Sequence, residues 1–250
     1  MSTITLPARA GTLRTVAAAR PTRTVLALTM AWAAIAVGLG TGLQALRPGT
    51  GGELAALVAT AGLTVFAVVV LANWGGPGRL GLVGPRRWRS PVWLLLPVVV
   101  CIFPVLGGFE PVSTGTLALL VAGYAMTGFA EEAVWRGVVL QALLPTGVWR
   151  AVLLSSALFG AVHLGNLAYR DSAFLVLLQV WGAFCAGVGY AALRLRTGAL
   201  WPLMITHAFG DLLPRICGLH GLGVYVVHDA VLLLAGLWLL RGARGNTVTA

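Results

Sequence analysis

Charged side chains are scarce in this chain of 250 residues. They make up 10% of the sequence and only 7 of them are acidic, whereas hydrophobic residues make up 58% and the mean hydropathy is +0.91. An ordinary soluble domain carries about 25% charged residues. The composition therefore excludes that class and predicts an integral membrane protein.

Lysine is absent, so all 17 basic residues are arginines. The net charge of +10 could indicate a nucleic-acid partner, but the arginines fall in short segments between apolar runs. That distribution is typical of charges that set membrane topology, so we expect a lipid bilayer and no nucleic acid as partner. Only three cysteines are present, within or beside apolar segments, and they indicate no disulfide framework.

Apolar runs long enough to cross a bilayer, about 17–25 residues each, recur along the chain. They lie roughly at 25–46, 54–74, 91–109, 114–143, 151–169, 172–193, 199–215 and 222–240. The predicted fold is all-α, a polytopic membrane helix bundle of about eight transmembrane helices. It comprises a cytoplasmic N-terminal tail (1–24), a single transmembrane domain (25–240) and a cytoplasmic C-terminal tail (241–250). The first apolar run is expected to be a retained helix, not a signal peptide.

The arginines also predict the orientation. With the N-terminus inside, 13 of them fall in cytoplasmic segments, 3 on the opposite side, and Arg136 lies within a span. Because positive charge accumulates on the cytoplasmic side, both termini are expected in the cytoplasm and the protein in the cell (plasma) membrane.

Three charged residues lie within the apolar segment 114–143, namely Glu131, Glu132 and Arg136. Such groups are costly at membrane depth and usually face a polar site inside the protein. Glu132 and Arg136 stand four residues apart, so they share a helix face and can pair. The pairing leaves Glu131 available for chemistry, and a structural ion pair is the alternative interpretation.

Two further predicted spans carry polar groups. His163 lies in the fifth, and His207 and Asp211 stand four residues apart on one face of the seventh. At a rise of 1.5 Å per residue, Glu131 lies roughly 18 Å from the cytoplasmic end of its helix, and His163 lies about as deep. His207 and Asp211 lie roughly 12–18 Å deep. The three helices should therefore bring these groups to one layer, as a polar site within the membrane.

A carboxylate beside an imidazole is suited to taking a proton from water. Glu131 is the candidate base, and His207 can donate a hydrogen bond to a developing oxyanion. These residue types predict hydrolysis of an amide by activated water, with no covalent acyl-enzyme.

In this order, the motifs resemble the CPBP family (CAAX proteases and bacteriocin-processing enzymes, also called the Abi family). Its signature is EExxxR, FxxxH, and HxxxN or HxxxD, on separate helices of an eight-helix membrane bundle. In this chain the signature is carried by Glu131-Glu132…Arg136, Phe159…His163 and His207…Asp211. The resemblance covers roughly residues 114–213.

The resemblance implies an intramembrane endopeptidase that cleaves a peptide or a membrane-associated protein. It implies that Glu131 and His163 activate water, and that His207 and Asp211 face the oxyanion. Supporting residues are Glu132, Arg136 and Phe159. Some members of the family carry Asn where this chain has Asp211, and an ionised Asp cannot donate a hydrogen bond as Asn does. Asp211 is therefore protonated, orients His207 or binds a metal.

A divalent metal such as zinc is an open alternative, because Glu131, His163, His207 and Asp211 are all good metal ligands. Full activity in a metal-free preparation would exclude it. The chain has no HExxH motif of the kind found in zinc proteases. The serines that precede Phe159 lack the GxSG-like setting of a serine protease.

Two functions other than proteolysis fit the same motifs. The first is a non-catalytic membrane protein, for bacteriocin immunity or as a scaffold, in which the polar residues form a packing core. The second is a proton-coupled transporter that uses the Glu/His/Asp cluster as a relay. The chain shows no inverted repeat and no paired broken helices, which speaks against the transporter. His228 and Asp229, near the opposite surface, are interpreted as a structural pair.

Overall fold

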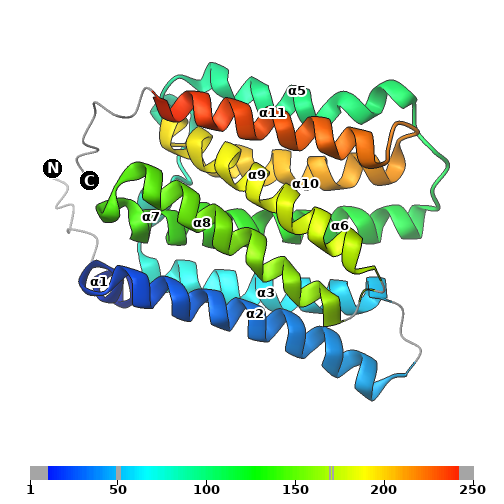
Figure 1. Ribbon diagram of the computed structural model, residues 1–250, viewed down its shortest axis with the longest axis horizontal. Helices are drawn as coiled ribbons and strands as arrows, with labels where there is room; N and C mark the ends of the chain where they lie inside the picture. The colour runs from blue at the N-terminus through cyan, green and yellow to red at the C-terminus, as the bar shows by residue number, and fades with distance from the viewer. Residues whose placement is uncertain (1–10, 49–51, 169, 171, 242–250) are drawn as a thin grey trace, which may run out of the picture.

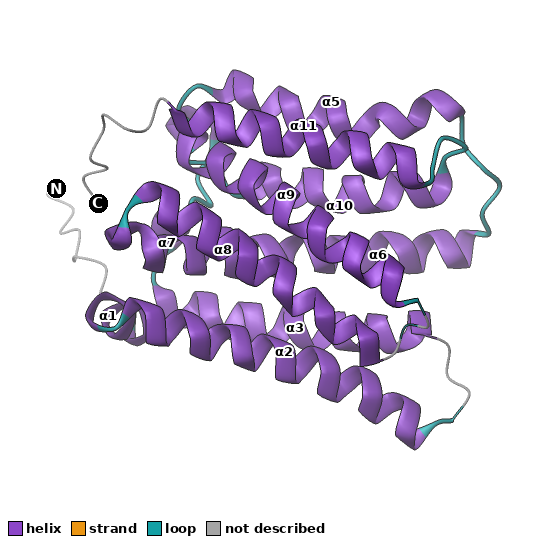
Figure 2. Ribbon diagram, in the orientation of Figure 1, coloured by secondary structure: helices purple, strands orange, loops and turns teal. Residues whose placement is uncertain are grey.

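The computed structural model describes residues 11–48, 52–168, 170 and 172–241, which form a bundle of long helices (Figures 1 and 2). These residues contain no β-strand, and one isolated bridge joins Phe109 to Cys217. The prediction of an all-α, polytopic membrane bundle is confirmed.

Six helical segments in the described ranges are long and apolar enough to cross a membrane. They are α2 (Pro21–Leu46), α3 (Gly52–Trp74), the segment Thr114–Thr146, the segment Val148–Ala168, α9 (Ala173–Thr197) and α11 (Leu222–Arg241). Each one overlaps a run predicted from the sequence.

The other two predicted spans form shorter helices. One is α10 (Trp201–Ile216), whose 16 residues extend about 24 Å, less than the roughly 30 Å of a bilayer core. The other is the apolar stretch Pro91–Gly107. It is divided into η2 (Pro91–Leu94), α5 (Leu95–Ile102) and η3 (Phe103–Gly107). Prolines begin η2 and stand early in η3, where a missing backbone N–H costs a helix least.

A short helix that the sequence did not predict, α1 (Thr12–Ala19), precedes α2 and packs against α2 and α3. It lies within the segment expected to be a cytoplasmic tail. Two more short elements, α4 (Pro77–Leu80) and η1 (Pro85–Arg87), follow α3. Residues 1–10 and 242–250, with Arg9, Arg244 and nearly all of the predicted C-terminal tail, lie outside the described residues.

The run expected to be one helix over 114–143 changes its winding in the middle. It begins as α6 (Thr114–Glu131), becomes the π-helix η4 (Glu132–Val139), and ends as α7 (Leu140–Leu143) and η5 (Leu144–Thr146). π-Helical turns are rare and frequently mark functional sites. All eight residues of η4 are buried. Its Trp135 packs between Trp32 of α2 and Phe159, with ring centroids 5.9 and 5.6 Å away.

The helix α9 lies between α8 (Val148–Val162) and α11, and α10 lies against α6 (Figure 1). The α9–α11 contact is close because it passes through two glycines: a Cβ on Gly236 would lie 2.9 Å from Cα of Gly189. The motif-bearing helices α6, α8 and α10 are thereby held in one bundle.

The helix α1, the start of α2, the connection between α3 and α5, the α7–α8 and α9–α10 connections and the end of α11 lie at the same end of the bundle in Figure 1. Most of the arginines belong to these segments. The fold therefore brings together the segments that were predicted to share one side of the membrane.

Candidate active site

Glu131, the last residue of α6, lies between two imidazoles. Its Oε1 is 3.9 Å from Nε2 of His163, and its Oε2 is 3.5 Å from Nε2 of His207. The three side chains are 13–14% exposed. The structure thus brings together residues from α6, from the end of α8 and from α10, as the depth argument predicted.

The proton position on His163 follows from its hydrogen bond. Nδ1 lies 2.8 Å from the backbone oxygen of Phe159, one turn earlier. A carbonyl oxygen can only accept, so Nδ1 carries the proton and donates it. In the neutral ring, Nε2 therefore presents a lone pair toward Glu131. His163 is held as an acceptor at the point where α8 gives way to η6 (His163–Ala168).

The proton position on His207 is set by a different partner. Its Nδ1 lies 2.8 Å from Oε1 of Glu132, a carboxylate with 0% exposure. An ionised carboxylate only accepts, so Nδ1–H donates to it. The opposite nitrogen, Nε2, then faces Glu131 at 3.5 Å and Asp211 at 3.6 Å. With two carboxylates on that side, Nε2 is placed to carry a second proton and act as a donor.

Arg136 forms an ion pair with Glu132 in the buried part of the site. Its Nη1 lies 3.1 Å from Oε1 of Glu132, and the side chain is only 2% exposed. The guanidinium lies over the Phe159 ring at 4.3 Å and near the Tyr190 ring at 5.8 Å, in range for cation–π attraction. The pairing of Glu132 with Arg136 that the spacing predicted is present, and it occurs at the start of the π-helix.

Aromatic rings enclose the imidazoles. Phe159 meets His163 edge-on with ring centroids 5.0 Å apart. Tyr190 of α9 stacks on His207 at 5.7 Å with an interplanar angle of 25°. Tyr190 is buried and was not singled out from the sequence. It stands among glycines and alanines in an apolar stretch of α9, a setting that does not distinguish it from a packing residue.

Asp211 is the most open member of the cluster. Its side chain is 40% exposed, and Oδ2 lies 3.6 Å from Nε2 of His207, one turn earlier on α10. Asp211 therefore lies at the rim of the site, whereas Glu132 lies at its base. In the part of the chain that the structure describes, no group of three or more His, Cys, Asp or Glu side chains has an arrangement that could hold a metal ion. The four residues named for the zinc alternative do not form such a group.

The site depends on a close approach of α6 and α10 at Gly128. A Cβ on this residue would collide with the carbonyl oxygen of Met204, and it would lie 3.0 Å from the backbone nitrogen of Ala208. Because Gly128 precedes Glu131 by three residues and Ala208 follows His207, this contact fixes the distance between the two catalytic candidates.

Other polar residues border this cluster. His228 and Asp229 of α11 contact each other, with Nδ1 to Oδ1 at 3.0 Å, and Nε2 of His228 lies beside Gly210, the neighbour of Asp211. Asn166 in η6 donates to the side-chain oxygen of Gln179 at 2.7 Å.

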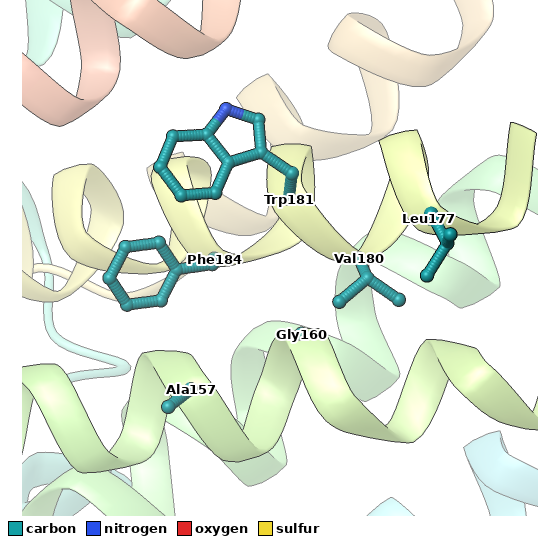
Figure 3. A pocket seen from close by; sticks show the side chains of 6 residues that line it. All are labelled: Ala157, Gly160, Leu177, Val180, Trp181 and Phe184. Atoms are coloured by element: carbon teal, nitrogen blue, oxygen red, sulfur yellow. The ribbon is translucent and has the colours of Figure 1, made fainter. Parts of the chain in front are cut away.

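An apolar pocket of about 330 Å³ lies between α8 and α9, on the outside of the bundle (Figure 3). In Figure 3 the rings of Trp181 and Phe184 extend from α9 beside it, and Ala157 and Gly160 lie on α8. None of its lining residues belongs to the polar cluster. The candidate active site is therefore identified from the charged residues and not from this pocket.

Residues 113–213 match a family model described as Type II CAAX prenyl endopeptidase Rce1-like. The matched range runs from the start of α6 into the last turn of α10 and contains all three motifs. It confirms the resemblance predicted from the sequence. No curated protein matches the chain.

Proposed function

We propose that this protein is an intramembrane endopeptidase in which Glu131, flanked by His163 and His207, activates water to hydrolyse a peptide bond. The family match supports a CAAX-type endopeptidase, and hence a hydrolase, in general. The assignment of Glu131 as the base rests on one observation: its carboxylate lies within 3.9 Å of the Nε2 atoms of both His163 and His207.

The first step uses Glu131 as the general base. It takes a proton from a water molecule as the water oxygen bonds to the carbonyl carbon of the scissile amide. His163 supports this step because its Nε2 lone pair can accept a hydrogen bond from the same water or from the protonated carboxyl group. Burial keeps bulk water out, which strengthens these interactions.

The second requirement is a donor for the oxygen that becomes negative. The Nε2–H group of His207 fits this role, since Glu132 fixes the ring through Nδ1. Asp211 can pair with the protonated ring from the rim, which makes it a positioning residue. The proton held by Glu131 then passes to the leaving amine, the C–N bond breaks, and the products are a carboxylic acid and an amine.

The substrate is a peptide or protein in a membrane, as the family match implies in general. We further propose that the protein resides in the plasma membrane with both termini in the cytoplasm. The arginine-rich end of the bundle supports that orientation.

The test compares cells that express the wild type, Glu131→Gln or Glu110→Gln at equal membrane levels. Glu110 is the matched control, because it is 51% exposed and faces His220, which is not a member of the cluster. Peptide termini from membranes and medium are profiled by mass spectrometry. We expect termini that depend on the wild type and on Glu110→Gln, and at least a 10²-fold loss with Glu131→Gln. Undiminished cleavage by folded Glu131→Gln would contradict the proposal.

A further inference from the structure

The cationic end of the bundle contains a buried arginine for which the described part of the chain supplies no counter-charge. Arg194 lies in the last turn of α9 and is 6% exposed. Its guanidinium rests on Gly81, which follows α4 with a φ of 78°, and a Cβ at that position would collide with it. The left-handed glycine thus leaves a space that the guanidinium fills.

Arg194 has no acidic partner within 11–48, 54–168 or 172–241. No ion pair recorded among the described residues involves it, and its Nε is buried without a hydrogen-bond acceptor. The acidic residues of the whole chain are Glu53, Glu110, Glu131, Glu132, Asp171, Asp211 and Asp229. None of them falls in 172–210, the stretch of chain on either side of Arg194, or in 54–109, which contains Gly81 and Arg89. A buried cation is costly unless it is paired, so an anion from outside the chain would stabilise this arginine.

The C-terminal carbonyl groups of α9 do not supply this negative charge to Arg194 alone, because a second arginine donates hydrogen bonds to them. Arg89 donates from its backbone N–H to the oxygen of Thr197 at 2.8 Å, and from Nη2 to the oxygen of Leu195 at 3.3 Å. The free C-terminal end of a helix is equivalent to roughly half a negative charge. Here that partial charge faces Arg89 as well as Arg194, and Arg89 adds a positive charge next to Arg194.

Two tryptophans place this corner at the membrane surface. Trp88 and Trp201 lie with ring centroids 5.2 Å apart, and both indole N–H groups donate to the oxygen of Val83, at 2.9 and 3.2 Å. Tryptophan is enriched at the level of lipid headgroups. Arg194 also stands three residues from the end of the candidate span Ala173–Thr197. The anion available at that depth is the phosphate of a phospholipid.

We propose that Arg194 and Arg89, with Gly81 as the floor, form a binding site for the phosphate of an anionic phospholipid. A guanidinium presents several N–H donors in a planar fork that matches phosphate oxygens. This site lies at the arginine-rich end, one turn of α9 beyond Tyr190, and it does not depend on the proposed catalysis.

The test measures thermal unfolding of the full-length protein in nanodiscs of phosphatidylcholine alone or with phosphatidylglycerol. We expect phosphatidylglycerol to raise the unfolding temperature of the wild type and of Arg196→Gln. Arg196 is the matched control, because it lies two residues away on α9 and is exposed. Arg194→Gln should lose most of this increase, and Arg194→Lys, which keeps the charge but not the fork, should lose part of it.

An equal increase in Arg194→Gln would overturn the proposal, as would an equal loss in Arg196→Gln, which would indicate diffuse attraction. Inorganic phosphate added to phosphatidylcholine discs separates the two phosphate sources, and a full increase from it would overturn the assignment to a lipid. Native mass spectrometry provides a second measurement if Arg194→Gln does not fold. The wild type should retain one phosphatidylglycerol after the other lipids dissociate, and Arg194→Lys should release it more readily.

Discussion

The contact of α6 with α10 at Gly128 provides a sharp test of the site geometry. In Gly128→Ala, the new methyl group would overlap the Met204 carbonyl oxygen and lie 3.1 Å from Cβ of Ala208. Ordinary van der Waals contact begins near 3.4 Å, so relieving the overlap requires the two helices to separate by about 1 Å. Glu131 and His207 lie on the two helices that separate.

We expect a loss in turnover number of about 10²-fold, since a misplacement of 1 Å can cost that much. Overpacking should also lower stability, by about 1–3 kcal/mol, which leaves a folded protein to measure. The assay follows cleavage of a peptide substrate identified by the terminal profiling, using monodisperse protein in detergent. The same substitution at Gly123 of α6 is the control, because a Cβ there meets only Leu57 Cδ1 at 3.5 Å.

Full turnover by folded Gly128→Ala would refute the reasoning, because it would show that chemistry does not require the present distance between Glu131 and His207. An equal loss in Gly123→Ala would refute it as well, because any enlargement of α6 would then have the same effect.

Two further substitutions test the base and the rim of the site. Glu132→Gln leaves the buried Arg136 without a counter-charge, and breaking a buried ion pair typically costs about 3–5 kcal/mol of stability. Both the unfolding temperature and the turnover number should therefore fall. An unchanged unfolding temperature would contradict the pairing of Glu132 with Arg136. Asp211→Asn should change turnover by less than about tenfold, because Asp211 lies at the rim of the site and the amide can itself donate to the oxyanion. A loss as large as that of Glu131→Gln would show that the charge of Asp211 is essential.

The sequence predicted which helices contribute to the cluster because charge inside an apolar run is costly and therefore conspicuous. Counting residues along each helix was enough to bring Glu131, His163 and His207 to one depth. Spacing alone also predicted the pairing of Glu132 with Arg136, since residues four apart share a face.

Other features depend on three-dimensional contacts that leave no periodic signal. In the sequence Tyr190 cannot be distinguished from the apolar residues around it, and only the structure shows that its ring stacks on His207. Gly128 is one of 33 glycines, and only the neighbouring helix shows why a side chain is excluded there. The π-helical winding of η4 has no residue pattern of its own that distinguishes it from an α-helix. The eight residues of α1 are too few to show a helical hydrophobic period.

The π-helix has a consequence for how this chain tolerates changes in length. Surface connections generally accept insertions and deletions, because few contacts depend on their register. In η4 all eight residues are buried, so removing any one of them deletes a packed group, and removing one between Glu132 and Arg136 also changes the spacing of that ion pair. Single-residue deletions scanned from 114 to 146 should therefore be tolerated least between 132 and 139, which makes this turn the part of the helix whose residue count is most constrained.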